Sequence, residues 1–198
     1  MHPDTPAAPV SLLLVGHGAG GGVDAPDLLA VRAAALAAGV AVVRVEQPYR
    51  VAGRRTPPPA AHLDDAWRAV VEAVRADPPM AGLPLVLAGR SSGARVACRT
   101  ATALGAAAVV ALAFPLHPPG KPDRSRLAEL DAPDVPVLVV QGARDPFGMP
   151  PAGPDRTVRV VPGDHSLRPS ADRVAEQTVT WLRAHGLARA ATDHHVNG

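Results

Sequence analysis

Short apolar runs, almost without polar interruption, alternate along this chain with stretches of helical periodicity. They lack the polar–apolar alternation of a strand that has one face in water, so we expect strands buried on both faces of a parallel sheet. The expected strands are Ser11 to Val15, Val40 to Val45, Leu83 to Ala88, Ala107 to Ala113, Val135 to Val140 and Thr157 to Val161.

The segments between these runs carry helix signals. Parallel neighbours need crossover connections, so the order predicts an α/β fold with a doubly wound, mostly parallel six-stranded sheet flanked by helices. Ligands bind such sheets beyond the carboxyl ends of the strands. We expect one domain at residues 10–187, with a flexible N-terminus at 1–9 and a flexible tail at 188–198. The expected helices are 26–36, with Asp24 as the cap, and 60–76, 92–104 and 168–185.

Composition narrows the class of protein. The chain has 198 residues, the size of one domain, and its 20 Lys and Arg side chains are balanced by 18 Asp and Glu side chains. We therefore expect a small-molecule substrate, with neither nucleic acid nor a membrane as partner. No apolar run approaches the roughly 18 residues of a membrane span, and a cytoplasmic location is expected. Cys98 is the only cysteine, which rules out an internal disulfide and makes a cysteine-based metal site implausible.

The segment Gly89-Arg90-Ser91-Ser92-Gly93 has the pattern G-x-S-x-G between an apolar run and a helical stretch. A strand, a sharp turn and a helix form the setting in which this pattern exposes a serine Oγ above a sheet. We therefore predict Ser91 as a nucleophile and the backbone N–H of Ser92 as a donor to an oxyanion. Ser91 is preferred to Ser92 because the glycine spacing fits only Ser91.

A serine nucleophile needs a base and a group that orients the base. Asp145 follows one expected strand and His165 follows the next, in the chain order serine, acid, histidine. We predict His165 as the base and Asp145 as its orienting acid. Asp164 is an alternative acid, although adjacent residues point in different directions.

With these residues the chain resembles the α/β-hydrolase superfamily, and more narrowly the small hydrolases of the KANL/Tex group, which are distant cousins of dienelactone hydrolases. The matching segments are GHGAGGG at 16–22, GRRTPPP at 53–59, GRSSG at 89–93, FPLHPPGKP at 114–122, QGARDPFG at 141–148 and GDHS at 163–166.

The resemblance implies a serine hydrolase, carboxylesterase-like, that cleaves a small ester or related acyl substrate through an acyl-enzyme intermediate. The resemblance implies no metal and no organic cofactor. The backbone N–H of Ala19 or Gly18 would complete an oxyanion hole with Ser92. We expect a truncated form of the fold: no large cap is inserted, and few residues precede Ser11, so the two extra strands of fuller members should be missing.

Substrate contacts are less sharply indicated. Arg50 and Arg90 follow expected strands and could bind an anionic ester, but loop arginines are also commonly solvated or bonded to backbone carbonyls. His117 is expected to shape the pocket wall. His17 could contact the substrate, and we interpret it mainly as a residue that shapes the glycine loop, not as the base.

Two other functions remain open. The chain could be a non-catalytic interaction or scaffold module, since an intact triad does not prove physiological turnover. The segment VGHGAGGG at 15–22 also satisfies G-x-G-x-x-G, and Glu46 could then bind a ribose. Against dinucleotide binding, the last glycine of such a loop belongs in the first turn of the helix, whereas Asp24 and Pro26 place the helix start beyond Gly21.

Overall fold

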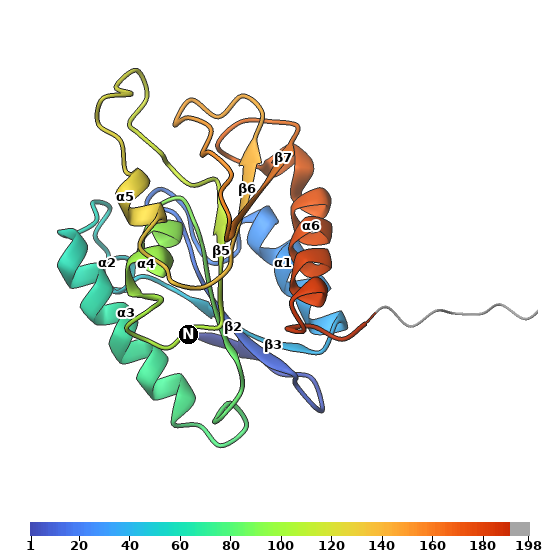
Figure 1. Cartoon of the computed structure of the whole chain (residues 1–198). Coiled ribbons are helices and arrows are strands. Elements are labelled where there is room, and N and C mark those ends of the chain that lie inside the picture. The colour runs from blue at the N-terminus through green and yellow to red at the C-terminus, as the bar shows by residue number, and fades with distance from the viewer. Residues whose placement is uncertain (191–198) are drawn as a thin grey trace, which may run out of the picture.

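A seven-stranded sheet forms the centre of the molecule (Figure 1). The computed structural model describes residues 1–190. The strand order is β1-β3-β2-β4-β5-β6-β7, and all neighbours are parallel except the antiparallel pair β1 and β3. The strands are β1 (His2–Asp4), β2 (Ser11–Gly16), β3 (Val40–Val45), β4 (Leu85–Arg90), β5 (Ala108–Leu112), β6 (Val137–Gly142) and β7 (Arg156–Val161).

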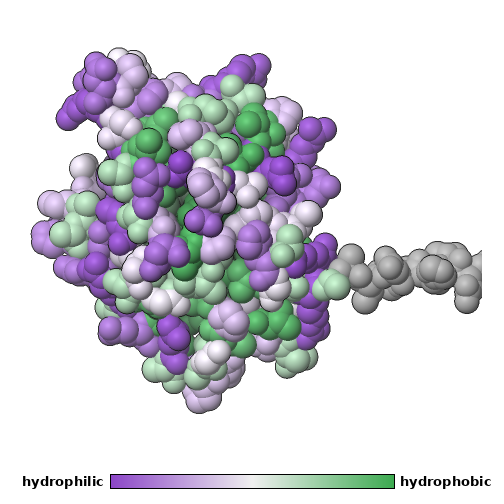
Figure 2. All heavy atoms as spheres, in the orientation of Figure 1, coloured by the Kyte–Doolittle hydropathy of each residue, from purple (hydrophilic) through white to green (hydrophobic). Residues whose placement is uncertain are grey.

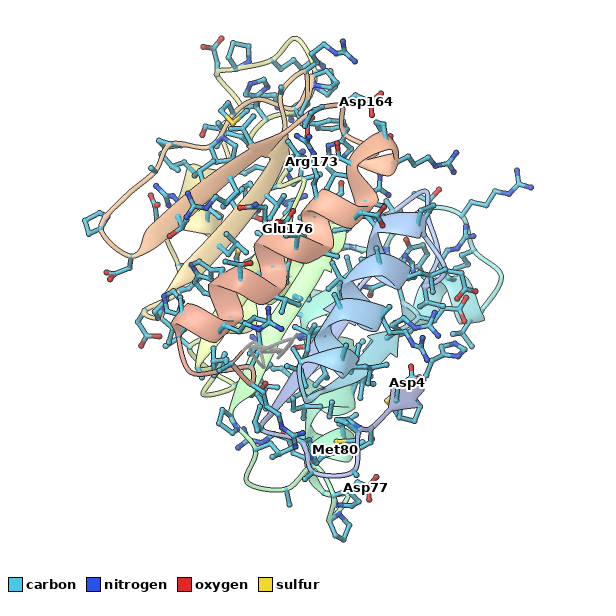
Figure 3. The ribbon with its side chains drawn as sticks, turned by 90° about the vertical axis from the view of Figure 1, so that its right-hand side faces the viewer. Asp4, Asp77, Met80, Asp164, Arg173 and Glu176 are labelled. Carbon is cyan, nitrogen blue, oxygen red and sulfur yellow. The ribbon has the colours of Figure 1, made fainter. Side chains whose placement is uncertain are left out.

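Helices cover both faces of this sheet. α1 and α6 lie side by side on one face, while α3 and α4 cover the other (Figures 1 and 3). The six expected strands and their crossover helices are therefore present, and the doubly wound architecture is confirmed. The helices are α1 (Pro26–Ala37), α2 (Pro48–Val51), α3 (Ala60–Arg75), α4 (Ser92–Thr100), α5 (Leu127–Leu130) and α6 (Ala171–Ala184), the last preceded by a 3-10 turn at Arg168–Ser170.

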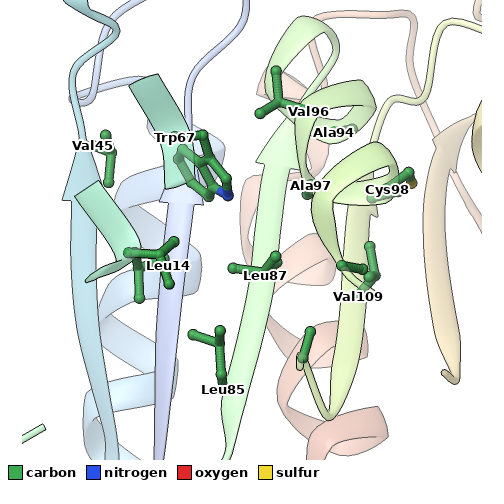
Figure 4. Packing of buried hydrophobic residues seen from close by; sticks show 14 of the residues in the cluster. Leu14, Val45, Trp67, Leu85, Leu87, Ala94, Val96, Ala97, Cys98 and Val109 are labelled. Carbon is green, nitrogen blue, oxygen red and sulfur yellow. The ribbon is translucent and has the colours of Figure 1, made fainter. Parts of the chain in front are cut away.

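The core has two layers because successive residues of each strand point to opposite faces. Leu12 and Leu14 pack under α3 and α4, whereas Leu13 and Val15 pack under α1 and α6. Figure 4 shows the first layer, in which Trp67 of α3 lies over the strands. Cys98 of α4 belongs to this layer, and burial raises the pKa of its thiol to about 12. It is therefore a protonated packing residue.

Ion pairs fasten α4 to its neighbours on this face. The Arg99 guanidinium donates to both carboxylate oxygens of Asp64 on α3, at 2.9 and 2.7 Å. Arg95 and Arg99 both donate to Glu129 on α5. Paired fork geometry of this kind fixes orientation as well as distance. The helix that begins just after Ser91 is thus held in place along its length.

Residues near both ends of the described chain contact the rest of the fold. The N-terminus was expected to be too short for the two extra strands of fuller members, but His2–Asp4 form one additional strand, β1, on the outer edge of β3. The Asp4 carboxylate pairs with Arg32 of α1, and this hydrogen bond lowers the pKa of Asp4. At the other end, Leu187 and Ala188 are buried and the Arg189 N–H donates to the Ala38 carbonyl. The rest of the expected tail, 191–198, lies outside the described residues.

α1 begins at Pro26 as expected, but its cap differs from expectation. The N-cap is Ala25, which makes no side-chain cap, and the Asp24 carboxylate instead pairs with Arg44 at 2.5 Å. Asp27, in the first helical turn, is the acidic side chain that is buried at this end of α1. The sequence signal for a helix start was correct, but the acid that belongs to it was misassigned.

The surface is mixed in character. Figure 2 shows hydrophilic side chains spread over one face of the molecule, with smaller groups of hydrophobic residues between them. Within residues 1–190, no helix combines the length and the apolar character that a membrane crossing requires.

Candidate active site

Ser91 occupies a sharp turn between β4 and α4. Its backbone φ is 53° and its ψ is −109°, in the left-handed range of φ that is uncommon for a residue with a side chain. The Ser91 N–H donates to the Leu112 carbonyl at 2.9 Å, which anchors the turn to the neighbouring strand. Strained backbone of this kind persists only where the surroundings enforce it. The structure thus places Ser91 in the strand–turn–helix setting that G-x-S-x-G predicts.

The two glycines of this motif allow backbone segments to touch. A Cβ on Gly89 would lie 2.2 Å from the carbonyl carbon of Gly93, and a Cβ on Gly93 would lie 2.4 Å from the carbonyl oxygen of Gly16. Both distances are far below van der Waals contact, and the obstructing atoms are backbone. Glycine is therefore required at both positions if β4, α4 and β2 are to meet so closely.

Ser91, His165 and Asp145 are joined in series by hydrogen bonds. His165 Nδ1 lies 2.8 Å from Asp145 Oδ2, and His165 Nε2 lies 2.8 Å from Ser91 Oγ. A carboxylate only accepts hydrogen bonds, so Nδ1 carries the proton and Nε2 is free to accept the Ser91 hydroxyl proton. The arrangement is that of a nucleophile, a base and an orienting acid.

A third glycine brings the acid and the base together. Asp145 follows β6 and His165 follows β7, and a Cβ on Gly142 would lie 2.4 Å from the Asp164 carbonyl oxygen. The Arg144 N–H donates to the Gly163 carbonyl at 2.9 Å. The two loops therefore pack backbone to backbone, which sets the distance between the Asp145 and His165 side chains.

Asp145 is held by a residue that the sequence analysis did not identify. The Gln141 side-chain amide lies within 2.9 Å of both Asp145 Oδ2 and the Gly148 carbonyl oxygen, and the Phe147 N–H donates to Asp145 Oδ1. Gln141 is completely buried in β6. Its signal in the sequence was a polar residue at the end of an otherwise apolar run.

Phe147 was also missed. Its ring stacks on the His165 imidazole with a centroid separation of 4.1 Å. The stacked ring limits the rotation of His165 and forms part of the pocket wall. Asp164, the alternative acid, is exposed and accepts the Ser166 N–H at 2.9 Å, so it turns the loop and does not contact the imidazole. Figure 3 shows Asp164 beyond the N-terminal end of α6.

An open pocket of about 810 Å³ lies over Ser91 and His165. One wall is the glycine loop after β2, where a Cβ on Gly20 or Gly22 would meet no atom within 4 Å. At these two positions the wall is bare backbone facing open space. The lining residues are 18–27, Glu46, Arg90, Ser91, Phe147, His165, Ser166 and Arg168.

The His17 side chain forms hydrogen bonds with backbone groups that fix the glycine loop. The Gln47 N–H donates to His17 Nε2 at 3.0 Å, so the ring proton sits on Nδ1, which donates to the Gly18 carbonyl at 2.7 Å. The side chain is buried, and burial lowers its pKa, which keeps the ring neutral. The Tyr49 hydroxyl donates to the Ala19 carbonyl at 3.1 Å. His17 thus bonds to the backbone of the loop and is not among the residues that line the pocket.

Of the other residues expected to contact the substrate, Arg90 lines the pocket, whereas Arg50 and His117 do not. Arg90 lines the pocket, and its Nη2 donates to the His165 carbonyl at 3.0 Å. Arg50 is not among the residues that line the pocket. His117 lies against Gly148, and its Nδ1 is 2.9 Å from the Pro118 carbonyl oxygen, so it supports the Asp145 loop from outside the pocket. Among the described residues, His, Cys, Asp and Glu side chains form no group of three that could hold a metal ion.

Comparison with known proteins identifies the family. The family model for the alpha/beta hydrolase domain matches residues 9–192, nearly the whole chain. The chain belongs to the alpha/beta hydrolase family. No curated protein matches the sequence.

Solved structures of alpha/beta hydrolases share the fold at low sequence identity. A serine hydrolase homologue from Coxiella burnetii superposes with a TM-score of 0.73 at 19% identity, covering 91% of this chain and 89% of that one. A serine hydrolase without lid from Xanthomonas campestris gives 0.73 at 23%, covering 92% and 87%. Dienelactone hydrolase from Anabaena variabilis gives 0.74 at 17%, covering 92% and 89%.

Proposed function

We propose that this alpha/beta hydrolase cleaves small carboxylic esters through an acyl-enzyme intermediate on Ser91. The observation that carries the proposal is the hydrogen-bonded series Ser91–His165–Asp145, of which Ser91 and His165 line an open pocket. His165 Nε2 takes the Ser91 proton as Oγ attacks the ester carbonyl carbon, and then returns that proton to the departing alcohol. Water, activated by the same nitrogen, hydrolyses the acyl-enzyme and frees Ser91.

Two backbone N–H groups are suited to stabilise the oxyanion. Ser92 is the first residue of α4, so its N–H has no partner within the helix. In a trans peptide the carbonyl and the N–H point in opposite directions, so the bond from His17 to the Gly18 carbonyl turns the Ala19 N–H away from His17. Gly18 lies beside Ser91, since its Cβ would be 3.4 Å from that of Ser91. We therefore assign the oxyanion hole to Ser92 and Ala19.

The pocket supports an uncharged substrate better than an anionic one. Arg90 is engaged by the His165 carbonyl and by the Asp27 carboxylate, which offsets its charge. Glu46 and Arg168 also line the pocket with opposite charges, and the carboxylate of Asp24, a further lining residue, is paired with Arg44. The Xanthomonas protein described as lacking a lid has a similar fold, and the open pocket here fits the same lidless arrangement.

Labelling with a fluorophosphonate tests the proposal directly. The probe phosphonylates a serine only when a base activates its hydroxyl, so we expect one adduct, mapped to Ser91 by mass spectrometry. The Ser92→Ala variant, altered at the neighbouring hydroxyl, should label at the wild-type rate. Folded protein that hydrolyses no short ester and takes up no probe would favour the scaffold alternative.

Replacing His17 tests the oxyanion assignment. In His17→Leu the Gly18 carbonyl loses its donor, and we expect kcat for p-nitrophenyl acetate to fall about 100-fold, the effect of losing one oxyanion donor. His17→Asn keeps an N–H close to the position of Nδ1 and should recover part of this loss. A His17→Leu enzyme that is folded and retains wild-type kcat would contradict the assignment.

A further inference from the structure

The Arg90 side chain connects three segments that meet under the pocket. Arg90 is the last residue of β4 and directly precedes Ser91. Its Nη2 donates to the backbone carbonyl of His165 at 3.0 Å, and its Nε lies 3.4 Å from Asp27 Oδ2. One planar guanidinium thus spans the Ser91 turn, the loop that carries His165 and the first turn of α1.

Asp27 anchors this guanidinium. The Asp27 side chain is 1% exposed and that of Arg90 is 16% exposed, so each charge depends on the other for compensation. Burial raises the pKa of Asp27, whereas Arg90 and the backbone N–H groups of Asp27 and Leu28 act to lower it. Asp27 itself is fixed by the start of a twelve-residue helix. Arg90 is therefore paired with a residue of a rigid element.

The loop that carries His165 has few other attachments toward Ser91. Asp164 and Ser166 bond within the loop itself. The Arg144 N–H holds the Gly163 carbonyl, but from the side of Asp145. Among the described residues, Arg90 is the side chain near Ser91 that donates a hydrogen bond to the backbone of His165.

We infer that Arg90, anchored by Asp27, is a positioning residue that holds His165 Nε2 within hydrogen-bonding distance of Ser91 Oγ. This inference rests on the proposed function. The orientation of the imidazole is set by Asp145 and Phe147, whereas Arg90 sets how close its backbone lies to the Ser91 turn. A guanidinium is needed because its Nη2 donates to the His165 carbonyl while its Nε stays 3.4 Å from the Asp27 carboxylate, which a single ammonium does not do in the same geometry.

Substitution of Arg90 tests the inference through a separation of kcat from KM. Arg90→Met keeps the length of the side chain but has no donor. We expect kcat for p-nitrophenyl acetate to fall about 100-fold while KM stays within about threefold, since a base displaced by an ångström loses rate, not binding. Fluorophosphonate labelling of Ser91 should slow in parallel. Arg90→Lys should recover less than half of the loss on a logarithmic scale.

A double-mutant cycle tests the role of Asp27. Asp27→Asn keeps the shape of the anchor but removes its charge, and we expect a loss in kcat of about 10-fold because Arg90 is no longer held. In Arg90→Met there is nothing left to anchor, so adding Asp27→Asn should lower kcat no further. Independent, multiplicative losses would show that Asp27 does not act through Arg90.

Arg75→Met is the matched control, because Arg75 also donates to a backbone carbonyl, that of Leu104, but on the exposed end of α3. It should leave kcat unchanged. A folded Arg90→Met enzyme with wild-type kcat would overturn the inference, and so would a change confined to KM, which would make Arg90 a substrate-binding residue. A wild-type protein without esterase activity or labelling would instead refute the proposed function.

Discussion

Replacing Ser91 with alanine is expected to lower kcat for p-nitrophenyl acetate by about 10⁶-fold, the loss typical of removing a nucleophile that acts together with its base. Without Oγ, His165 has no hydroxyl to deprotonate and no acyl-enzyme forms. The oxyanion donors remain, so a small residual rate above that of water is expected. Steady-state hydrolysis measures kcat, and the release of p-nitrophenol in the first turnover shows whether an acyl-enzyme forms.

The fold should survive this substitution. Alanine has the same Cβ as serine, and the hydrogen bonds that hold the turn are made by the backbone of Ser91. The thermal midpoint of Ser91→Ala should therefore match that of the wild type. Ser92→Ala, one residue away, should retain activity. Undiminished turnover by a pure, folded Ser91→Ala protein would rule out Ser91 as the nucleophile.

Gly89→Ala is expected to have the largest effect on stability. The added methyl group would stand 2.2 Å from the carbonyl carbon of Gly93 and 2.5 Å from the nitrogen of Ala94. Neither atom belongs to a side chain that could rotate away, so β4 and α4 must separate. We expect the free energy of unfolding to fall by about 4 kcal/mol or more. The midpoint of urea unfolding, or the loss of soluble protein, measures this effect.

Gly20→Ala provides the matched control. The same methyl group at Gly20 would meet no atom within 4 Å, so the urea midpoint should stay at the wild-type value. If Gly89→Ala unfolded at the same urea concentration as Gly20→Ala, the close approach of β4 and α4 would not be a requirement of the fold.

The strands were predictable because burial on both faces leaves a continuous apolar signature. The run around Leu85 is apolar for this reason, and its pairing with β2 and β5 follows from the crossover helices. The Ser91 turn was predictable because its geometry demands glycine on either side, and few other residues tolerate that demand. Physical requirements that fall on adjacent residues leave a local pattern.

Requirements that join distant residues leave no such pattern. Gln141 reads as a polar residue at a strand end, and nothing near it in the sequence identifies Asp145 as its partner. Asp27 resembles an ordinary acidic residue at a helix start, although its charge faces Arg90, more than sixty residues away. β1 was missed because a strand of three residues is too short to show a recognisable alternation of polar and apolar residues.

The loops were the least predictable part of the site. Arg50 and His117 follow strands at the correct edge of the sheet, which is why they were expected in the pocket. The direction of a loop side chain depends on turns that the apolar pattern does not encode. The Pro-rich segment carries His117 against Gly148 instead, outside the pocket wall.

Gly20 and Gly22 are positions in the pocket wall where an added Cβ would meet no other atom within 4 Å. Neither glycine has a left-handed backbone, and neither is pressed against another atom, so side chains can be introduced there without moving Ser91 or His165. Different residues at these two positions would change the size or the polarity of the same cavity. The loop is thus a natural starting point for directed evolution toward a chosen ester.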